Sequence, residues 1–241
     1  MDYILYSPNH KPMTTSRDTS VVAFLRQIPF LENLPYADLH ELALICQMEQ
    51  IQRSCAIYNK GESSSHLFIL LRGSVKLCSF SEDGREIIKE MLSPITLFGE
   101  LGLVGEKERQ ENALSMQDEV QLLRLPTESF RKLMRKHPNL SLDIVDWLGT
   151  RLRRAESRLE ALMFKDARER IIDFLKDSAE NQGKKIGFEL LIKHSMTQQD
   201  IANYTGTSRQ TVTSVLNELR KSNLIYFNRR SILIRDLERL F

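Results

Sequence analysis

The chain carries near its carboxyl end the stretch Thr197-Gln-Gln-Asp-Ile-Ala-Asn-Tyr-Thr-Gly-Thr-Ser-Arg-Gln-Thr-Val-Thr-Ser-Val-Leu-Asn-Glu-Leu219. This pattern predicts two helices joined by a tight turn. Thr197 and Asp200 resemble a capping box in which Asp replaces the more usual Glu or Gln. Gly206 suits the left-handed conformation that ends a helix, and Ser208 suits the amino-terminal cap of the next one. Such a pair is typical of proteins that place one helix in the major groove of DNA.

The second helix is predicted to have one buried and one polar face. Its apolar residues recur at i, i+3, i+4 and i+7, and they are Val212, Val215, Leu216 and Leu219. The opposite face carries short polar side chains and an arginine, which suit base edges and phosphates. We expect base contacts from Arg209 and Gln210, phosphate contacts from Ser208 and Thr211, and further DNA contacts from Thr197, Gln198, Thr213 and Ser214. An ordinary helical hairpin with a solvated polar face is the alternative.

Two short apolar runs follow this helix and predict a β-hairpin. Residues 224–227 and 232–234 are separated by Asn228-Arg-Arg-Ser231. A hairpin directly after a helix-turn-helix forms a wing, and Arg229 and Arg230 at its tip would lie along the phosphate backbone. Taken alone, two arginines in a turn would indicate only a solvated loop.

Composition narrows the class of protein. At 241 residues the chain holds one large domain or two ordinary ones, and its net charge of +2 does not by itself indicate nucleic acid. No apolar run approaches the ~20 residues of a membrane span, and residues 1–8 lack the pattern of a secretory signal. The cysteines Cys46, Cys55 and Cys78 show no CxxC spacing and suit buried thiols in a reducing compartment. We therefore expect a cytoplasmic protein without membrane association.

The middle of the chain has a different pattern of apolar and turn residues. Residues 21–50 have the pattern of short helices, and short apolar runs broken by turn residues follow up to about residue 125. Asp83-Gly84 is a good hairpin turn, and many strands at this spacing indicate a sandwich or barrel. A long helix is expected to begin at Pro138, a residue suited to the first turn.

The long helix has an apolar seam. Its residues are spaced four and three apart, as in a coiled coil, and are Leu148, Leu152, Ala155, Leu159 and Leu162. Charged residues occupy the rest of the helix surface. This narrow seam predicts a parallel partner helix and hence a homodimer. Packing of the seam on the chain's own β-domain is the alternative.

A β-roll, a long helix and a winged helix in this order resemble the Crp/Fnr (catabolite activator and fumarate–nitrate reductase) family of bacterial transcription regulators. The resemblance covers about residues 21–235 and rests on Leu67-Phe-Ile-Leu-Leu-Arg-Gly-Ser-Val-Lys-Leu77, Phe98-Gly-Glu-Leu-Gly-Leu103 and residues 196–226. It implies an α+β chain with an N-terminal double-stranded β-helix, the cyclic-nucleotide-binding-like β-roll, at residues 1–137. A dimerisation helix at 138–165 and a C-terminal winged helix-turn-helix domain at 166–241 would follow. It also implies a homodimer on a pseudo-palindromic double-stranded DNA operator, and contact with RNA polymerase.

The resemblance also implies an effector pocket in the β-roll, but the sequence departs there from the cAMP-binding members. Gly99 and Glu100 match the pair that holds the ribose hydroxyl and the backbone. Gln110 and Glu111 stand where an Arg-Ser pair holds the cyclic phosphate, and a carboxylate there would repel it. Arg109 lies one residue earlier. We expect an effector other than cAMP, or none, and the candidate pocket residues are Gly99, Glu100, Leu101, Arg109, Gln110 and Glu111.

Other cofactors are not expected either. Ala155 and Glu156 replace the Thr-Ser pair that contacts the purine in the cAMP-binding members, and iron–sulfur members have an N-terminal cysteine cluster that is missing here. The histidines His10, His40, His66, His137 and His194 show no metal-ligand spacing, so no haem or metal site is predicted. No catalytic signature occurs, so we expect no enzyme. The alternative function is a cyclic-nucleotide-binding regulatory subunit of another protein, which would lack a winged helix.

The recognition helix also differs from that of the cAMP-responsive members. Arg209 matches their guanine-reading Arg, whereas Gln210 replaces a Glu and Ser214 replaces a second Arg. Gln prefers the adenine edge, while Glu accepts a hydrogen bond from cytosine. The preferred half-site should therefore differ from TGTGA at the position that Gln210 reads.

Overall fold

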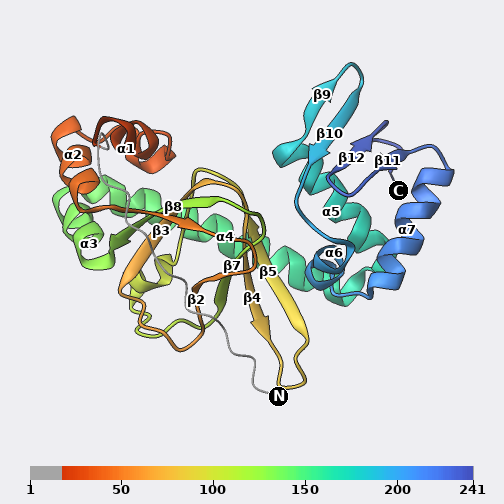
Figure 1. Ribbon diagram of the computed structural model, residues 1–241, viewed down its shortest axis with the longest axis horizontal. Helices are drawn as coiled ribbons and strands as arrows, with labels where there is room; N and C mark the ends of the chain where they lie inside the picture. The colour runs from red at the N-terminus through yellow and green to blue at the C-terminus, as the bar shows by residue number, and fades with distance from the viewer. Residues whose placement is uncertain (1–17, 241) are drawn as a thin grey trace. The chain divides into compact units, whose positions relative to one another are not determined.

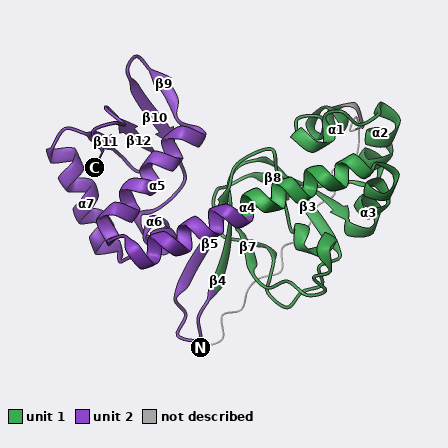
Figure 2. Cartoon of the chain, turned by 180° about the vertical axis from the view of Figure 1, so that it is seen from behind, with its two compact units in different colours: residues 1–79, 89–151 green, residues 80–88, 152–241 purple. Residues whose placement is uncertain are grey.

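The computed structural model describes residues 18–240 and divides the chain into two compact units. Unit 1 comprises residues 1–79 and 89–151, and unit 2 comprises residues 80–88 and 152–241 (Figure 2). The expectation about a signal at residues 1–8 lies outside the described residues. Within the described chain, no helix has the length and apolar character needed to cross a membrane.

Unit 1 begins with short helices, as the sequence predicted. These are α1 (Asp18–Leu25), the 3-10 helix η1 (Pro29–Leu31) and α2 (Tyr36–Ile45). The helical segment was predicted to reach residue 50, and this end was wrong because β1 (Gln47–Ile51) already forms there. Residues 47–51 pair with a strand 69 to 77 positions away in sequence, from Gln47 beside Arg124 to Ile51 beside Val120. That long-range pairing overrides the local pattern.

The predicted β-roll is confirmed and consists of two four-stranded sheets (Figure 1). One sheet has the strand order β1–β8–β3–β6, and the other has the order β2–β7–β4–β5. The strands are β2 (Ala56–Tyr58), β3 (His66–Arg72), β4 (Val75–Phe80), β5 (Glu86–Leu92), β6 (Thr96–Phe98), β7 (Asn112–Ser115) and β8 (Val120–Pro126), with the 3-10 helix η2 (Glu100–Val104) after β6. The Asp83-Gly84 turn joins β4 to β5, where Gly84 has a φ of 81°.

Strand β3 contains a continuous run of apolar residues, and its position between two core clusters explains this run. Leu67, Ile69 and Leu71 pack in one core cluster together with residues of the helices. Phe68 and Leu70, which point the other way, pack in the second cluster with residues of the opposite sheet. Side chains alternate across a strand, so a strand that is covered on both faces must be apolar at every position.

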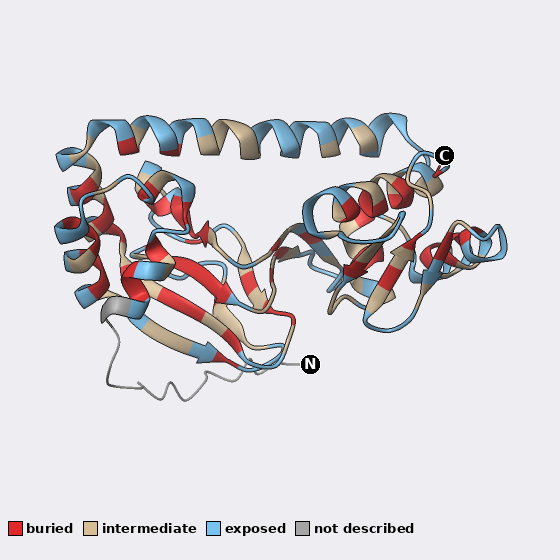
Figure 3. Ribbon diagram, turned by 90° about the horizontal axis from the view of Figure 1, so that it is seen from above, coloured by how far each residue is buried: buried red, intermediate tan, exposed pale blue. Residues whose placement is uncertain are grey.

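The chain leaves the β-roll through α3 (Thr127–Lys136) and the long helix α4 (Pro138–Phe164), which begins at Pro138 as predicted. Leu140 and Ile144 in its first turns are buried in the core of unit 1. Leu152 and the apolar residues after it are exposed (Figure 3). One helix therefore has a packed amino-terminal part and an uncovered carboxyl-terminal part.

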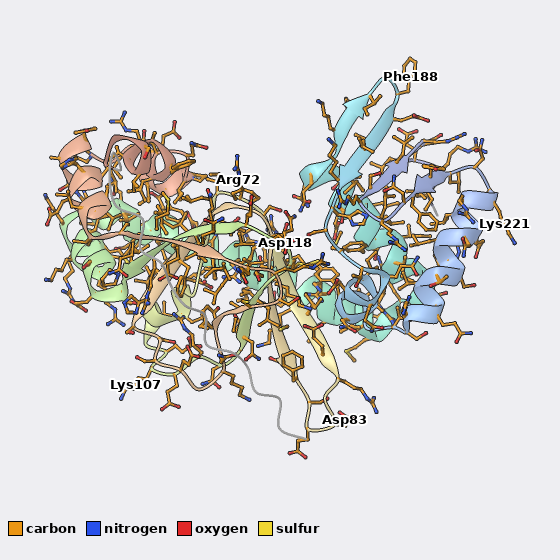
Figure 4. The ribbon with its side chains drawn as sticks, in the orientation of Figure 1. Arg72, Asp83, Lys107, Asp118, Phe188 and Lys221 are labelled. Atoms are coloured by element: carbon orange, nitrogen blue, oxygen red, sulfur yellow. The ribbon has the colours of Figure 1, made fainter. Side chains whose placement is uncertain are left out.

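Unit 2 contains the predicted winged helix-turn-helix. Its elements are α5 (Ala167–Gln182), β9 (Lys184–Ile186), β10 (Glu189–Lys193), α6 (Gln198–Thr205), α7 (Arg209–Lys221), β11 (Ile225–Phe227) and β12 (Ser231–Ile234), and its sheet has the order β11–β12–β10–β9. Asp166 and Glu169 form a capping box at the start of α5. The turn between β9 and β10 carries a fully exposed Phe188, which points away from the strands (Figure 4).

A buried carboxylate joins α2 to α3 in unit 1. Asp38 is 4% exposed, accepts a hydrogen bond from Lys136 and lies 2.8 Å from Nε2 of His137. The hydrogen bond from Lys136 lowers the pKa of Asp38 below its ordinary value of 3.8, although burial opposes the shift. A carboxyl group with a lowered folded-state pKa stabilises the fold above its unfolded-state pKa and loses that contribution as the pH falls through the folded-state value.

We therefore predict that Asp38→Asn lowers the melting temperature at neutral pH. The difference from wild type should shrink as the pH falls below 3.8, because the wild-type carboxylate then also becomes protonated. Thermal unfolding followed by circular dichroism across this pH range measures the effect. An equal loss at neutral and acidic pH would show that the ion pair does not provide the stability.

Candidate nucleic-acid interface and effector pocket

The helix-turn-helix begins with the predicted capping box. Thr197 Oγ1 accepts a hydrogen bond from Asp200 N at 3.1 Å, and Asp200 Oδ2 accepts one from Thr197 N at 2.8 Å. Gly206 ends α6 in the left-handed conformation with a φ of 64°. Ser208 Oγ then accepts from Thr211 N at 3.0 Å and caps α7. These local bonds fix where α6 stops and where α7 starts.

The two predicted faces of α7 are confirmed. The apolar residues Val212, Val215, Leu216 and Leu219 are at most 5% exposed. On the polar side Arg209, Gln210 and Ser214 are exposed. Since the amino-terminal residues of a recognition helix are the ones that reach base edges, this face has the chemistry and the position needed to read DNA.

Two of the predicted DNA contacts are also bound to each other. The Thr213 hydroxyl donates to Gln198 Oε1 at 2.6 Å, and its oxygen lies 2.9 Å from Arg209 O. This bond links the first turn of α6 to the middle of α7 and holds the helix pair at a fixed angle. A DNA contact by either side chain remains a prediction.

The wing forms where the sequence placed it. Asn228 Oδ1 accepts hydrogen bonds from Arg230 N at 2.8 Å and from Ser231 N at 2.9 Å, which tightens the turn between β11 and β12. Arg229 and Arg230 are exposed at this turn. Their guanidinium groups are therefore accessible to phosphates.

The sequence reasoning missed two arginines that hold the carboxyl end of α6. Arg170 of α5 donates to Thr205 O at 2.8 Å and to Gly206 O at 3.2 Å. Arg158 of α4 donates to Tyr204 O at 2.8 Å. Cations stabilise the negative end of a helix dipole. On the sequence alone both residues look like solvated positions on amphipathic helices, so no local signal could have found them.

In the β-roll, Arg109 points inward and lies against Gly99. Its side chain is 2% exposed, donates from Nη1 to Gly99 O at 2.8 Å and donates to His66 O. Its guanidinium carbon lies 4.3 Å from the ring centroid of Tyr58. A Cβ on Gly99, whose φ is +75°, would lie 2.9 Å from Arg109 Nη1, so the site needs glycine there.

Glu100 is buried and is already paired. Its carboxylate accepts a hydrogen bond from Arg151 of α4, and Arg151 also donates to Glu90 of β5. Burial raises the pKa of Glu100, and Arg151 opposes part of that shift. Glu111 Oε2 accepts from Lys89 Nζ at 3.1 Å. The carboxylate that the resemblance matched to the ribose-binding position is thus held by a guanidinium group of the chain itself.

The structure separates the predicted pocket residues into two groups. Gly99, Glu100, Arg109 and Glu111 lie around the same interior region, whereas Leu101 and Gln110 are exposed and line an open surface depression. The backbone explains this division: Arg109 N donates to Glu62 O and Arg109 O accepts from Gly61 N, both at 2.8 Å. This pairing places Arg109, and not Gln110, against Gly99.

Between residues 18 and 240, no group of three His, Cys, Asp or Glu side chains is arranged to hold a metal ion. Cys46, Cys55 and Cys78 are free thiols. Burial raises the pKa of Cys46 to about 12, so this thiol stays protonated and unreactive at neutral pH.

Two family models match the chain: a cyclic nucleotide-binding domain at residues 48–137 and a Crp-like helix-turn-helix domain at residues 169–241. The chain belongs to the Crp/Fnr family of transcription regulators. A CRP-like cAMP-activated global transcriptional regulator of Mycobacterium tuberculosis is 30% identical over 200 residues, covering 82% of this chain and 89% of that protein. The global nitrogen regulator of Synechocystis sp. is 31% identical over 191 residues, covering 78% and 84% of the two chains.

Solved structures agree with the fold of this Crp/Fnr member. FixK2 from Bradyrhizobium japonicum has a TM-score of 0.74 at 21% identity, covering 81% of this chain and 96% of that chain. The predicted family and architecture are therefore confirmed. Its relatives are transcription regulators and not enzymes, which confirms the prediction that the chain is not an enzyme.

For this Crp/Fnr regulator we predict that Arg209→Ala weakens specific DNA binding by about 1–3 kcal/mol and relaxes the preference at one guanine. The guanidinium group would otherwise bind the O6 and N7 edge of that base. Fluorescence anisotropy with an operator and its single-base variants measures both effects. Unchanged affinity and preference would refute the assignment of Arg209.

Arg230→Ala is the matched change on the wing. It should weaken binding to all sequences by a similar factor, because a phosphate contact carries no base information. It should also reduce the slope of log affinity against log salt by about 1. A change of base preference in Arg230→Ala would instead place this arginine in a groove.

Proposed function

We propose that the chain is a homodimeric, sequence-specific transcription regulator of the cytoplasm that binds a pseudo-palindromic operator. Its β-roll would respond to an effector other than cAMP, or to none. The observation that carries the proposal is the exposed polar face of α7 on a rigidly capped helix-turn-helix. In a dimer, two such helices would enter successive major grooves about 34–36 Å apart. Contact with RNA polymerase is a further expectation from the family.

The dimer is supported by the exposed seam of α4. Leu152 and Leu159 are each 60% exposed and Leu162 is 50% exposed, and Ala155 is exposed between them. A row of apolar side chains at coiled-coil spacing gains roughly 25 cal/mol for each Å² that a partner helix covers. Leu148 differs, because it packs partly against the core of unit 1. The first turns of α4 thus pack on the β-domain of the same chain, which was the alternative to a dimer seam. The apolar side chains of the later turns are exposed and could pack against a second copy of the chain.

The pocket chemistry supports an effector other than cAMP. Glu100 is already bound by Arg151, so a ribose hydroxyl would have to compete with a charged hydrogen bond. Glu90 and Glu111 add negative charge nearby, which Lys89, Arg109 and Arg151 offset. The cations that a cyclic phosphate would need in this region are already paired with carboxylates or carbonyl oxygens of the chain.

Cyclic AMP remains the second candidate for the effector, and one observation favours it. Arg109 is a buried cation beside Gly99, and the Mycobacterium tuberculosis relative is named as cAMP-activated. The guanidinium group of Arg109, however, is already hydrogen-bonded to the carbonyl oxygens of Gly99 and His66. A phosphate would need to displace these bonds.

We predict that Leu159→Glu converts the dimer into monomers at micromolar concentration, because it places a carboxylate in the apolar seam. Sedimentation equilibrium measures the change in mass. Operator affinity should fall with it, since a monomer reads only one half-site.

Arg154→Glu serves as the control for this experiment. It introduces the same charge on the exposed part of α4 outside the seam, so the mass should stay that of a dimer. Monomers in both variants, or in neither, would contradict the assignment of the seam.

We also predict that millimolar cAMP leaves the melting temperature of the wild-type protein unchanged in a thermal shift assay. A ligand that binds only the native state raises the free energy of unfolding by RT ln(1 + [L]/Kd). Operator DNA provides the positive control in the same assay. A concentration-dependent rise with cAMP would establish cAMP as a ligand and overturn the interpretation of Glu100 and Glu111.

A further inference from the structure

Arg158 joins two segments of unit 2 that are far apart in the sequence. Its guanidinium carbon lies 4.0 Å from the ring centroid of Tyr204 in α6, and Nη2 donates to Tyr204 O at 2.8 Å. The same nitrogen donates to Ile88 O at 3.0 Å. Ile88 lies in β5, four residues after Gly84 of the turn of the β4–β5 hairpin. One side chain of α4 therefore binds both a strand of the hairpin and the first helix of the helix-turn-helix.

A second bond connects the beginning of β5 to α6 directly. Asn203 Nδ2 donates to Glu86 Oε2 at 2.7 Å. Residues 80–88 belong to unit 2 together with α6 and the carboxyl-terminal part of α4 (Figure 2). The strands of the hairpin continue into the second sheet of the β-roll. The hairpin is thus part of that sheet and is also hydrogen-bonded to α6.

The contact falls at the place that sets the direction of α7. Tyr204 O is bound by Arg158, and Thr205 O and Gly206 O are bound by Arg170. Cations at successive carbonyls complete the carboxyl end of α6. Gly206 then makes the turn into the capped start of α7. A shift of the last turn of α6 would therefore move the residues that face DNA.

The hairpin contact leaves the DNA-reading face uncovered. Asn203 and Tyr204 lie on α6, whereas Arg209, Gln210 and Ser214 of α7 remain exposed. The contact therefore does not block DNA. It orders the helix-turn-helix before DNA arrives, which reduces the cost of fixing it on binding.

We propose that Arg158 is a positioning residue that couples the β4–β5 hairpin to operator binding. Docking of the hairpin on α6 and binding of DNA to α7 favour each other. This inference rests on the proposed reading of DNA by α7. Because coupling between two binding events is reciprocal, operator DNA must also tighten the hairpin on α6.

Hydrogen exchange of the full-length protein, measured by mass spectrometry with and without operator DNA, tests this coupling. In the wild type, amide exchange of residues 81–88 should slow when operator is added. In Arg158→Met, which keeps an apolar stem but loses the guanidinium group, this slowing should disappear. Operator affinity of the variant should fall about fivefold or more, the lower end of typical coupling between sites.

Arg154→Met is the matched control, because it removes a guanidinium group from an exposed position four residues earlier in α4. It should retain both the affinity and the slowed exchange. A wild type that binds no DNA would refute the proposed function. A wild type that binds operator with unchanged hairpin exchange would overturn the coupling, and so would an Arg158→Met protein that keeps the slowed exchange. If Arg158→Met destabilises unit 2, the comparison of the wild type with and without DNA still decides.

Discussion

The burial of one apolar stripe on α7 is the constraint on which the DNA-reading surface depends. Val212, Leu216 and Leu219 are at most 1% exposed, and α7 contacts α5, α6 and β11. Full burial of one such side chain contributes roughly 1.5–3 kcal/mol, so rotation of the helix by half a turn would cost several times that amount. With the stripe fixed, Arg209 and Gln210 can only face outward. The packing of the apolar face of α7 therefore determines which of its side chains can contact DNA.

Features set by neighbouring residues could be predicted from the sequence. The Thr197–Asp200 capping box, the left-handed Gly206 and the Ser208 cap all lie within a few positions of the residues they bind. The proline at the start of α4 is local in the same sense. Their geometry depends on backbone preferences that each residue carries with it.

Features set by distant partners could not be predicted. β1 was expected to be helical, and only its pairing with β8 makes it a strand. The inward position of Arg109 depends on backbone bonds to Gly61 and Glu62, nearly 50 residues earlier. The bonds from Arg158 to Tyr204 and Ile88 cross 46 and 70 positions. An arginine on a helix gives no sign in the sequence of which carbonyl it will bind.

The proposed function requires two copies of α7 to read one operator without cAMP. Selection of binding sites from a random DNA pool by the purified full-length protein, followed by sequencing, tests this most directly. We expect an inverted repeat whose half-sites are about 10–10.5 base pairs apart, centre to centre, with a specified guanine in each. The same sites should be recovered whether or not cAMP is present. Recovery of single half-sites, of no common sequence, or of an operator only when cAMP is added would contradict it.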